Sequence, residues 1–211
     1  METLMSFTRK ETFARFDEEP DESFYAQPRF VTHIDDEAIA RVTELYREFF
    51  PANGRILDLM SSWVSHLPEE VSYERVVGIG LNEAELARNP RLDDYVVQNL
   101  NENPQLAFAD AEFDAAAICV SIQYLTRPVE VLRDVGRCLK EGAPLVITFS
   151  NRCFPTKAVR VWQMLDDAGH GELIKEYLKQ AGNWEATEFI DCSSHGKKTD
   201  PLYAVVARTR E

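Results

Sequence analysis

The segment 56–82 constrains the fold of this chain more than any other part of the sequence. Residues 56–60 are apolar except for Asp58, and two serines follow them. This pattern is typical of a buried strand that runs into a turn and the start of a helix. A second apolar run, 76–79, ends at Gly80, 22 residues after Asp58. Strand, turn, short helix and strand make a βαβ unit, and such units bind nucleotides or cofactors at the carboxyl ends of their strands.

The rest of the chain continues this alternation of helices and strands. Periodicity and turn residues predict helices over 35–50, 81–88 and 129–139, one long helix or a pair of helices over 157–181, and further strands over 94–99, 113–120, 144–149, 184–192 and 201–208. The connection between the last two strands, 193–200, is too short for a crossover helix, so these strands are expected to be antiparallel. The prediction is therefore one α/β domain with a seven-stranded, mostly parallel sheet and helices on both faces.

The first 34 residues have no clear period, and we expect them to form an arm or lid that wraps onto a domain spanning 35–211. The formal net charge is -13, and the first 38 residues contribute ten acids and only four bases. This charge argues against nucleic acid or an anionic membrane as a partner. It leaves the oligomeric state open.

Composition also bears on metals and location. The four cysteines, Cys119, Cys138, Cys153 and Cys192, lie far apart and form no cluster with metal-ligand spacing, so no metal is expected. No apolar run is long enough to cross a membrane, and the beginning of the sequence lacks the apolar centre of a signal peptide. We therefore expect a reduced, cytoplasmic protein.

Four segments resemble the class I S-adenosylmethionine-dependent methyltransferases: ILDLMSS, VVGIGLN, AFADAEFDAAAICVSIQYL and VLRDVGRCLKEGAPLVITFSN. The resemblance covers about 35–208 and implies a Rossmann-like fold whose last strand is inserted antiparallel. Residues 137–143 are similar to the family's R-x-L-K-x-G-G signature. Residues 106–114 are similar to a loop of the small-molecule branch that contains quinone methyltransferases. The first motif, DLMSSWVSHLP, resembles that of an uncharacterised group.

The resemblance implies S-adenosylmethionine as the cofactor, S-adenosylhomocysteine as its product, and a set of residues that bind it. Asp58 stands at the family's acid position, but Ser61 and Ser62 fall where glycines are expected. Gly80 stands where the family has a ribose-binding acid, and Asn99 stands where it has an adenine-binding Asp. The candidate cofactor-binding residues are Arg29, Asp58, Met60, Ser61, Ser62, Gly80, Leu81, Asn82, Asn99, Leu100 and Ser121.

Other residues are candidates for the acceptor side. Tyr124 follows the fourth strand, where it could orient an acceptor, and His33 in the arm is a candidate base. Tyr25, Asn151 and Arg152 are candidates for binding the substrate. For each of these side chains, an ordinary structural role is the alternative.

The predicted function is methyl transfer from S-adenosylmethionine to a small-molecule acceptor. The alternative is a non-catalytic binding or regulatory protein that keeps the fold without the family's ligand contacts. A nicotinamide-dependent oxidoreductase is disfavoured, because that reading predicts GxGxxG after the first strand and an acid near the end of the second. Neither is present.

Overall fold

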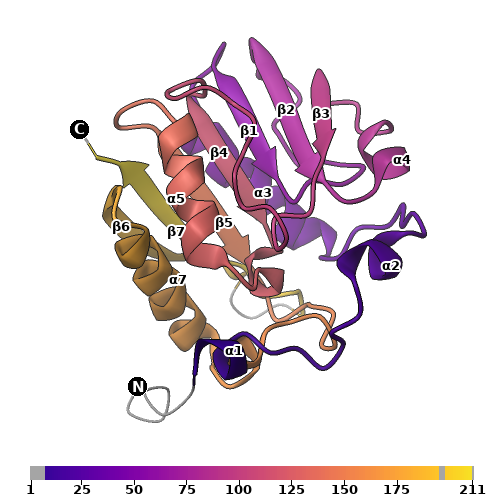
Figure 1. Ribbon diagram of the computed structural model, residues 1–211. Helices are drawn as coiled ribbons and strands as arrows, with labels where there is room; N and C mark the ends of the chain where they lie inside the picture. The colour runs from indigo at the N-terminus through magenta and orange to yellow at the C-terminus, as the bar shows by residue number, and fades with distance from the viewer. Residues whose placement is uncertain (1–7, 195–197, 211) are drawn as a thin grey trace.

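The computed structural model describes residues 8–194 and 198–210, which form a seven-stranded sheet in the order β3-β2-β1-β4-β5-β7-β6 (Figure 1). The strands are β1 Arg55–Leu59, β2 Arg75–Gly80, β3 Asp94–Val97, β4 Ala115–Cys119, β5 Pro144–Phe149, β6 Trp184–Asp191 and β7 Tyr203–Thr209. Neighbouring strands from β3 to β5 are parallel, and β7 is antiparallel to both β5 and β6. The predicted fold class is confirmed.

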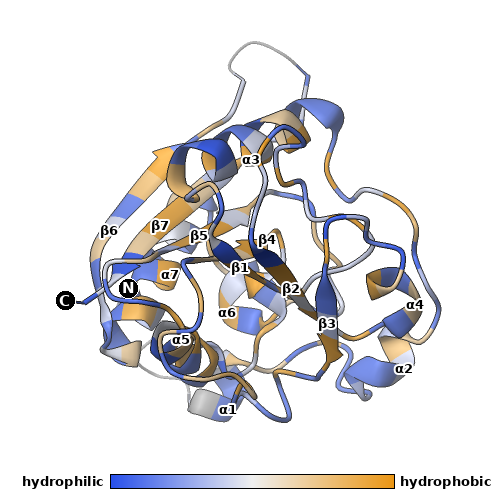
Figure 2. Cartoon of the chain, turned by 90° about the horizontal axis from the view of Figure 1, so that it is seen from above, coloured by the Kyte–Doolittle hydropathy of each residue, from blue (hydrophilic) through white to orange (hydrophobic). Residues whose placement is uncertain are grey.

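Helices cover both faces of this sheet. They are α1 Arg9–Thr12, α2 Asp21–Tyr25, α3 Asp36–Phe49, α4 Glu83–Leu86, the 3-10 turn η2 Ile122–Tyr124, α5 Pro128–Cys138, α6 Arg160–Gln163 and α7 Asp167–Ala181. Helices α5 and α7 lie on one face, and α3 lies on the other, so that the strands run between α3 and α5 (Figure 2). Helix α3 begins where predicted, because the Asp35 side chain accepts a hydrogen bond from Ala38 N at 2.9 Å.

The core is divided by the sheet into two apolar layers. Alternate residues of each strand point to opposite faces. In β1, for example, Leu57 and Leu59 pack with α5 and α7, whereas Ile56 packs with Val42 and Tyr46 of α3. Burial on both faces explains why the central strands read as continuous apolar runs in the sequence.

The helix predicted after β1 is not formed, so that part of the prediction was wrong. The connection from 60 to 74 contains no helix. The hydroxyls of Ser61 and Ser65 both donate to Asp58 Oδ2 at 2.6 Å, which holds the chain in a loop instead of capping a helix. Met60 and His66 have left-handed backbones, with φ of 54° and 51°, which also interrupts helical geometry.

Smaller differences from the predicted boundaries have local causes. Strand β3 ends at Val97 because Asn99 forms a turn in which its side chain accepts from Asn101 N at 3.0 Å. Of the two alternatives predicted over 157–181, the structure has the pair of helices, α6 and α7, because Asp166 caps a new helix through Gly169 N at 2.9 Å.

The arm is attached to the sheet domain near residues 14–17 and at Asp35, and further hydrogen bonds hold the part between them. The base of the arm is hydrogen-bonded to the segment after β5, since Asp17 N donates to Thr156 O at 2.9 Å and Arg160 N donates to Ala14 O at 2.8 Å. At the other end, Asp35 N and Asp200 N each donate to the other residue's carboxylate, at 3.0 and 2.7 Å. Residues 22–34, called the lid segment here, run between these attachments.

Candidate functional site

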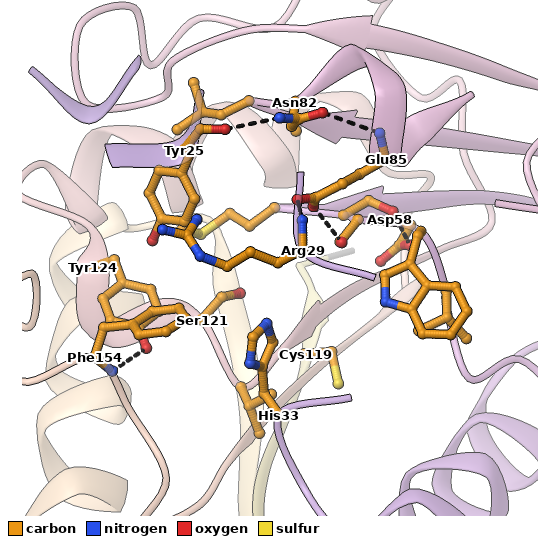
Figure 3. Close-up of a pocket in the computed structure, with 18 of the residues that line it drawn as sticks. Tyr25, Arg29, His33, Asp58, Asn82, Glu85, Cys119, Ser121, Tyr124 and Phe154 are labelled. Carbon is orange, nitrogen blue, oxygen red and sulfur yellow. Dashed lines mark hydrogen bonds between the residues drawn. The ribbon is translucent and has the colours of Figure 1, made fainter. Parts of the chain in front are cut away.

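A cavity of about 420 Å³ lies at the carboxyl ends of the parallel strands, with the lid segment as part of its wall (Figure 3). This volume is within the usual range of small-molecule sites, about 300–1,000 Å³. The structure brings every candidate residue from the sequence to this one cavity: Tyr25, Arg29, His33, Asp58, Met60, Ser61, Ser62, Gly80, Leu81, Asn82, Asn99, Leu100, Ser121, Tyr124, Asn151 and Arg152. Their individual roles stay predictions.

Asp58 is the buried acid of the cavity, with only 4% of its surface exposed. Burial raises the pKa of its carboxyl to about 6, although hydrogen bonds from Ser61 and Ser65 act in the opposite direction. Asn89 supports this arrangement by donating to Ser65 Oγ at 2.7 Å and to the carbonyl of Ser62 at 2.9 Å. The serines of the unusual first motif therefore solvate a buried carboxylate.

The loop after β1 has the backbone shape that glycine usually provides. Its left-handed residue is Met60, immediately before the two serines. Ser61 N donates to Ile79 O at 2.7 Å, which draws the loop against the end of β2. A Cβ atom at Gly80 would overlap the carbonyl oxygen of Ser61. The absence of an acid at position 80 is therefore a steric requirement of this loop.

The amides expected to contact ribose and adenine are already bonded to the arm. Asn82 Nδ2 donates to the carbonyls of Tyr25 and Ala26, at 2.8 and 3.2 Å, and Asn82 Oδ1 caps α4 through Glu85 N. Asn99 Nδ2 donates to the Glu22 carboxylate at 2.7 Å. The structure thus places both side chains at the cavity but gives each of them a partner in the protein.

Two buried polar atoms at the cavity have no hydrogen-bond partner within 8–194 and 198–210. They are Nη1 of Arg29 and Oγ of Ser121. The rest of the Arg29 guanidinium is held in place, because Nη2 donates to Phe24 O at 2.8 Å and the group lies 4.6 Å from the centre of the Phe24 ring. Such unpaired groups are costly to bury, so an acceptor that reached them would stabilise the protein.

Aromatic side chains form the opposite wall. Tyr124 accepts a hydrogen bond from Phe154 N at 2.8 Å through its hydroxyl, and burial raises the pKa of this hydroxyl to about 12. The His33 ring lies 5.2 Å from the Phe154 ring, and loss of surrounding water lowers the pKa of His33. Arg152 is mostly exposed and pairs with Asp200 at 3.6 Å.

Sequence analysis did not select several residues that the structure brings to the cavity. Glu85 projects from α4 to the loop after β1, Asn101 binds Asp21 of the arm at 2.9 Å, and Phe154 contacts both Tyr124 and the lid segment. Glu85 carried a detectable signal, because an acid occupies a position of α4 that faces the protein. Phe154 also carried a signal, since its place after the fifth strand suggests that it could line an apolar pocket. The contact of Asn101 with the arm joins distant segments and carried none.

Metal binding and membrane insertion have no visible structural basis in the described part of the chain. No group of three or more His, Cys, Asp or Glu side chains between residues 8–194 and 198–210 is arranged to hold a metal ion. Over the same residues, no helix combines the length and the apolar character needed to cross a membrane.

Comparison with known proteins supports the class suggested by this geometry. The model of a methyltransferase domain family matches residues 60–147, which include the loop after β1, strands β2 to β4 and the first part of β5. No curated protein matches the chain. The matched range includes the carboxyl ends of β2, β3 and β4, which border the cavity.

Solved structures with a similar fold include methyltransferases and one cyclase. The 4+2 cyclase SpnF is 18% identical, with a TM-score of 0.64 over 90% of this chain and 91% of its own. Phosphoethanolamine N-methyltransferase 2 of Haemonchus contortus, solved with S-adenosyl-L-methionine, is 16% identical, with a TM-score of 0.58 over 82% of this chain and 52% of its own. An S-adenosylmethionine-dependent methyltransferase of Mesorhizobium loti is 16% identical, with a TM-score of 0.54 over 78% and 96%.

These likenesses establish the fold of the class I S-adenosylmethionine-dependent methyltransferases. At such low identity they do not by themselves define the reaction.

Proposed function

We propose that this protein transfers a methyl group from S-adenosylmethionine to a small-molecule acceptor. The observation that carries the proposal is that one cavity contains both the buried Asp58 carboxyl and an Arg29 N–H that has no hydrogen-bond partner. An amino acid has an ammonium group and a carboxylate, which are the complements of these two side chains. The methionine part of the cofactor therefore fits the polar groups present.

The cofactor would supply an electrophilic methyl group on its sulfonium sulfur. On this proposal Asp58 accepts from the ammonium group, and Arg29 and Ser121 donate to the carboxylate. The loop after β1, with left-handed Met60, allows close approach of the backbone. The lid segment excludes water from the cavity, and positioning of the two reactants supplies most of the catalysis.

The acceptor is proposed to be small and partly apolar, as in the quinone-methyltransferase-like branch. Support comes from the aromatic wall of Tyr25, Tyr124 and Phe154. The Tyr124 hydroxyl stays protonated at neutral pH because its pKa is about 12, so it can orient an acceptor as a donor. His33 is neutral at the same pH because its pKa is lowered, and it can accept a proton. Arg152 and Asn151 at the mouth suit a polar end of the acceptor.

The alternative function is binding or regulation without catalysis. The amides of Asn82 and Asn99 favour it, since both are bonded to the arm. The fold also occurs in SpnF, which is a cyclase. The unpaired N–H of Arg29 and the buried Asp58 count against an empty, purely structural cavity, because each lowers stability without a ligand.

Titration of the purified protein with S-adenosylhomocysteine, followed by calorimetry, tests this function. We expect binding in the micromolar range, about -8 kcal/mol. Asp58→Ala should abolish the binding heat while the circular dichroism spectrum and cooperative unfolding persist. Absence of binding up to millimolar ligand would contradict methyl transfer and would leave the binding or regulatory alternative.

The remaining proposals concern surroundings and partners. We propose a cytoplasmic protein whose partner is a small-molecule acceptor rather than nucleic acid or a membrane. The acidic net charge supports this. All four cysteines are free thiols in the structure, which suits a reducing compartment.

A further inference from the structure

Glu85 is a buried carboxylate whose two oxygens join separate parts of the cavity wall. Only 9% of its surface is exposed. Oε2 accepts from the Ser62 hydroxyl at 2.5 Å, and Oε1 accepts from the backbone N of Arg29 at 2.7 Å. The side chain therefore connects α4, the loop after β1 and the lid segment.

Ser62 and Glu85 depend on each other. Glycine at position 62 would leave Glu85 Oε2 without the hydroxyl that now solvates it, and a buried unpaired acceptor is costly. Asn89 fixes the loop from the other side by donating to the Ser62 carbonyl and to Ser65 Oγ. One of the departures from the usual glycine-rich motif thus has a definite use: it provides a rigid donor for a carboxylate that holds the lid segment.

The residue held by Glu85 places a positive charge at the cavity. No helix follows β1, so the positive potential of a helix N-terminus is not available there. Arg29 supplies the positive charge instead, and hydrogen bonds hold both its backbone N and its guanidinium group. Glu85 holds the backbone N, and the Phe24 carbonyl holds Nη2, which leaves the buried Nη1 unpaired.

We propose that Glu85, supported by Ser62, is a positioning residue that fixes the lid segment so that Arg29 presents its unpaired N–H to a ligand carboxylate. This inference deepens the proposed function, because that carboxylate would be the one on the methyl donor. Glu85 acts through the Arg29 main chain and does not itself contact the ligand. It also restrains the lid segment when no ligand is present.

Hydrogen exchange of the ligand-free protein tests the restraint directly. Glu85→Ala and the milder Ser62→Ala are expected to raise exchange in peptides covering 22–34 by about tenfold or more, the effect of losing a hydrogen bond to a charged group. Glu85→Gln keeps an acceptor for Arg29 N and should retain most of the protection. Glu83→Gln, an exposed position on the same helix, is the matched control. Unchanged exchange in Glu85→Ala and Ser62→Ala would overturn the proposal.

Binding of two related ligands tests the connection to Arg29. S-adenosylhomocysteine has a carboxylate, and 5′-methylthioadenosine has the same nucleoside without it. Glu85→Ala should weaken the binding of S-adenosylhomocysteine by about tenfold and change the binding of 5′-methylthioadenosine by no more than about twofold. In a protein that already carries Arg29→Ala, Glu85→Ala should cause no further loss of S-adenosylhomocysteine binding. Equal weakening of both ligands would mean that Glu85 contacts the nucleoside, which overturns the positioning role. If the unaltered protein binds neither ligand, the proposed function fails, and the exchange experiment still decides whether Glu85 restrains the lid segment.

Discussion

Asp58→Asn is expected to make the protein more stable and, at the same time, a much weaker ligand binder. The Asp58 carboxyl has a pKa of about 6 in the folded protein, against a usual value of 3.8, because it is buried. Below pH 3.8 the carboxyl is protonated in both the folded and the unfolded state, so it does not lower the free energy of unfolding. The free energy of unfolding then falls as pH rises towards 6, and the loss reaches about 3 kcal/mol above that pH.

An amide at position 58 removes this penalty, because its carbonyl oxygen can still accept from Ser61 and Ser65. Urea unfolding at pH 8 should show a free energy of unfolding about 2–3 kcal/mol higher for Asp58→Asn. The difference between variant and unaltered protein should shrink as pH falls from 6 towards 4. Glu172→Gln, the same change at an exposed position, should have no such pH-dependent effect. A variant that is less stable at pH 8 would show that the carboxylate is stabilised by the fold itself.

The same substitution should weaken the binding of S-adenosylhomocysteine by at least about tenfold at pH 8, since a hydrogen bond between charged groups is lost. A gain in stability with a loss of binding is the pattern expected of a residue retained for its ligand. If binding were unaffected, Asp58 would have no role in holding the ligand's ammonium group.

Lys157→Ala is expected to cause a large loss of stability. The Lys157 side chain is fully buried at the base of the arm. Its Nζ donates to Glu19 O at 2.7 Å and lies 3.3 and 3.4 Å from the carboxylates of Asp17 and Asp21. Removing one partner of a buried ion pair leaves the other charge uncompensated, which costs about 3–5 kcal/mol.

Urea unfolding measures the global part of this loss, and limited proteolysis within residues 13–34 measures release of the arm. Lys157→Met keeps most of the apolar stem of the side chain. It should also be destabilised, because it removes the positive charge that compensates the carboxylates of Asp17 and Asp21. Lys179→Ala is the control, since that side chain is 80% exposed. Stability of Lys157→Ala close to that of the control would mean that Arg15, which pairs with Asp21 at 2.7 Å, suffices to hold the arm.

The sequence predicted the scaffold well because its signals are local. The Asp35 cap and the apolar face of α3 are formed by residues within a few turns of one another, and the apolar run of β5 matches its strand at both ends. The cavity was predictable for a related reason. Parallel strands end at one edge, so polar residues after β1, β2 and β4 had to meet there.

The missing helix after β1 shows where local signals fail. Two serines before an apolar stretch are typical of a helix start, but here their hydroxyls serve the buried Asp58. The partners of Asn82 and Asn99 were also not predictable, because they lie 57 and 77 residues away in an arm without periodicity. Long-range polar contacts of this kind leave no pattern in a single sequence.

The contact between Ser61 and Gly80 limits what can be engineered at the end of β2. An acid at position 80 requires more than one substitution, because its side chain would collide with the backbone of the preceding loop. The loop over 60–66 and the end of β2 can change only together. A designer who wants an acid at the end of β2 must therefore transplant both pieces.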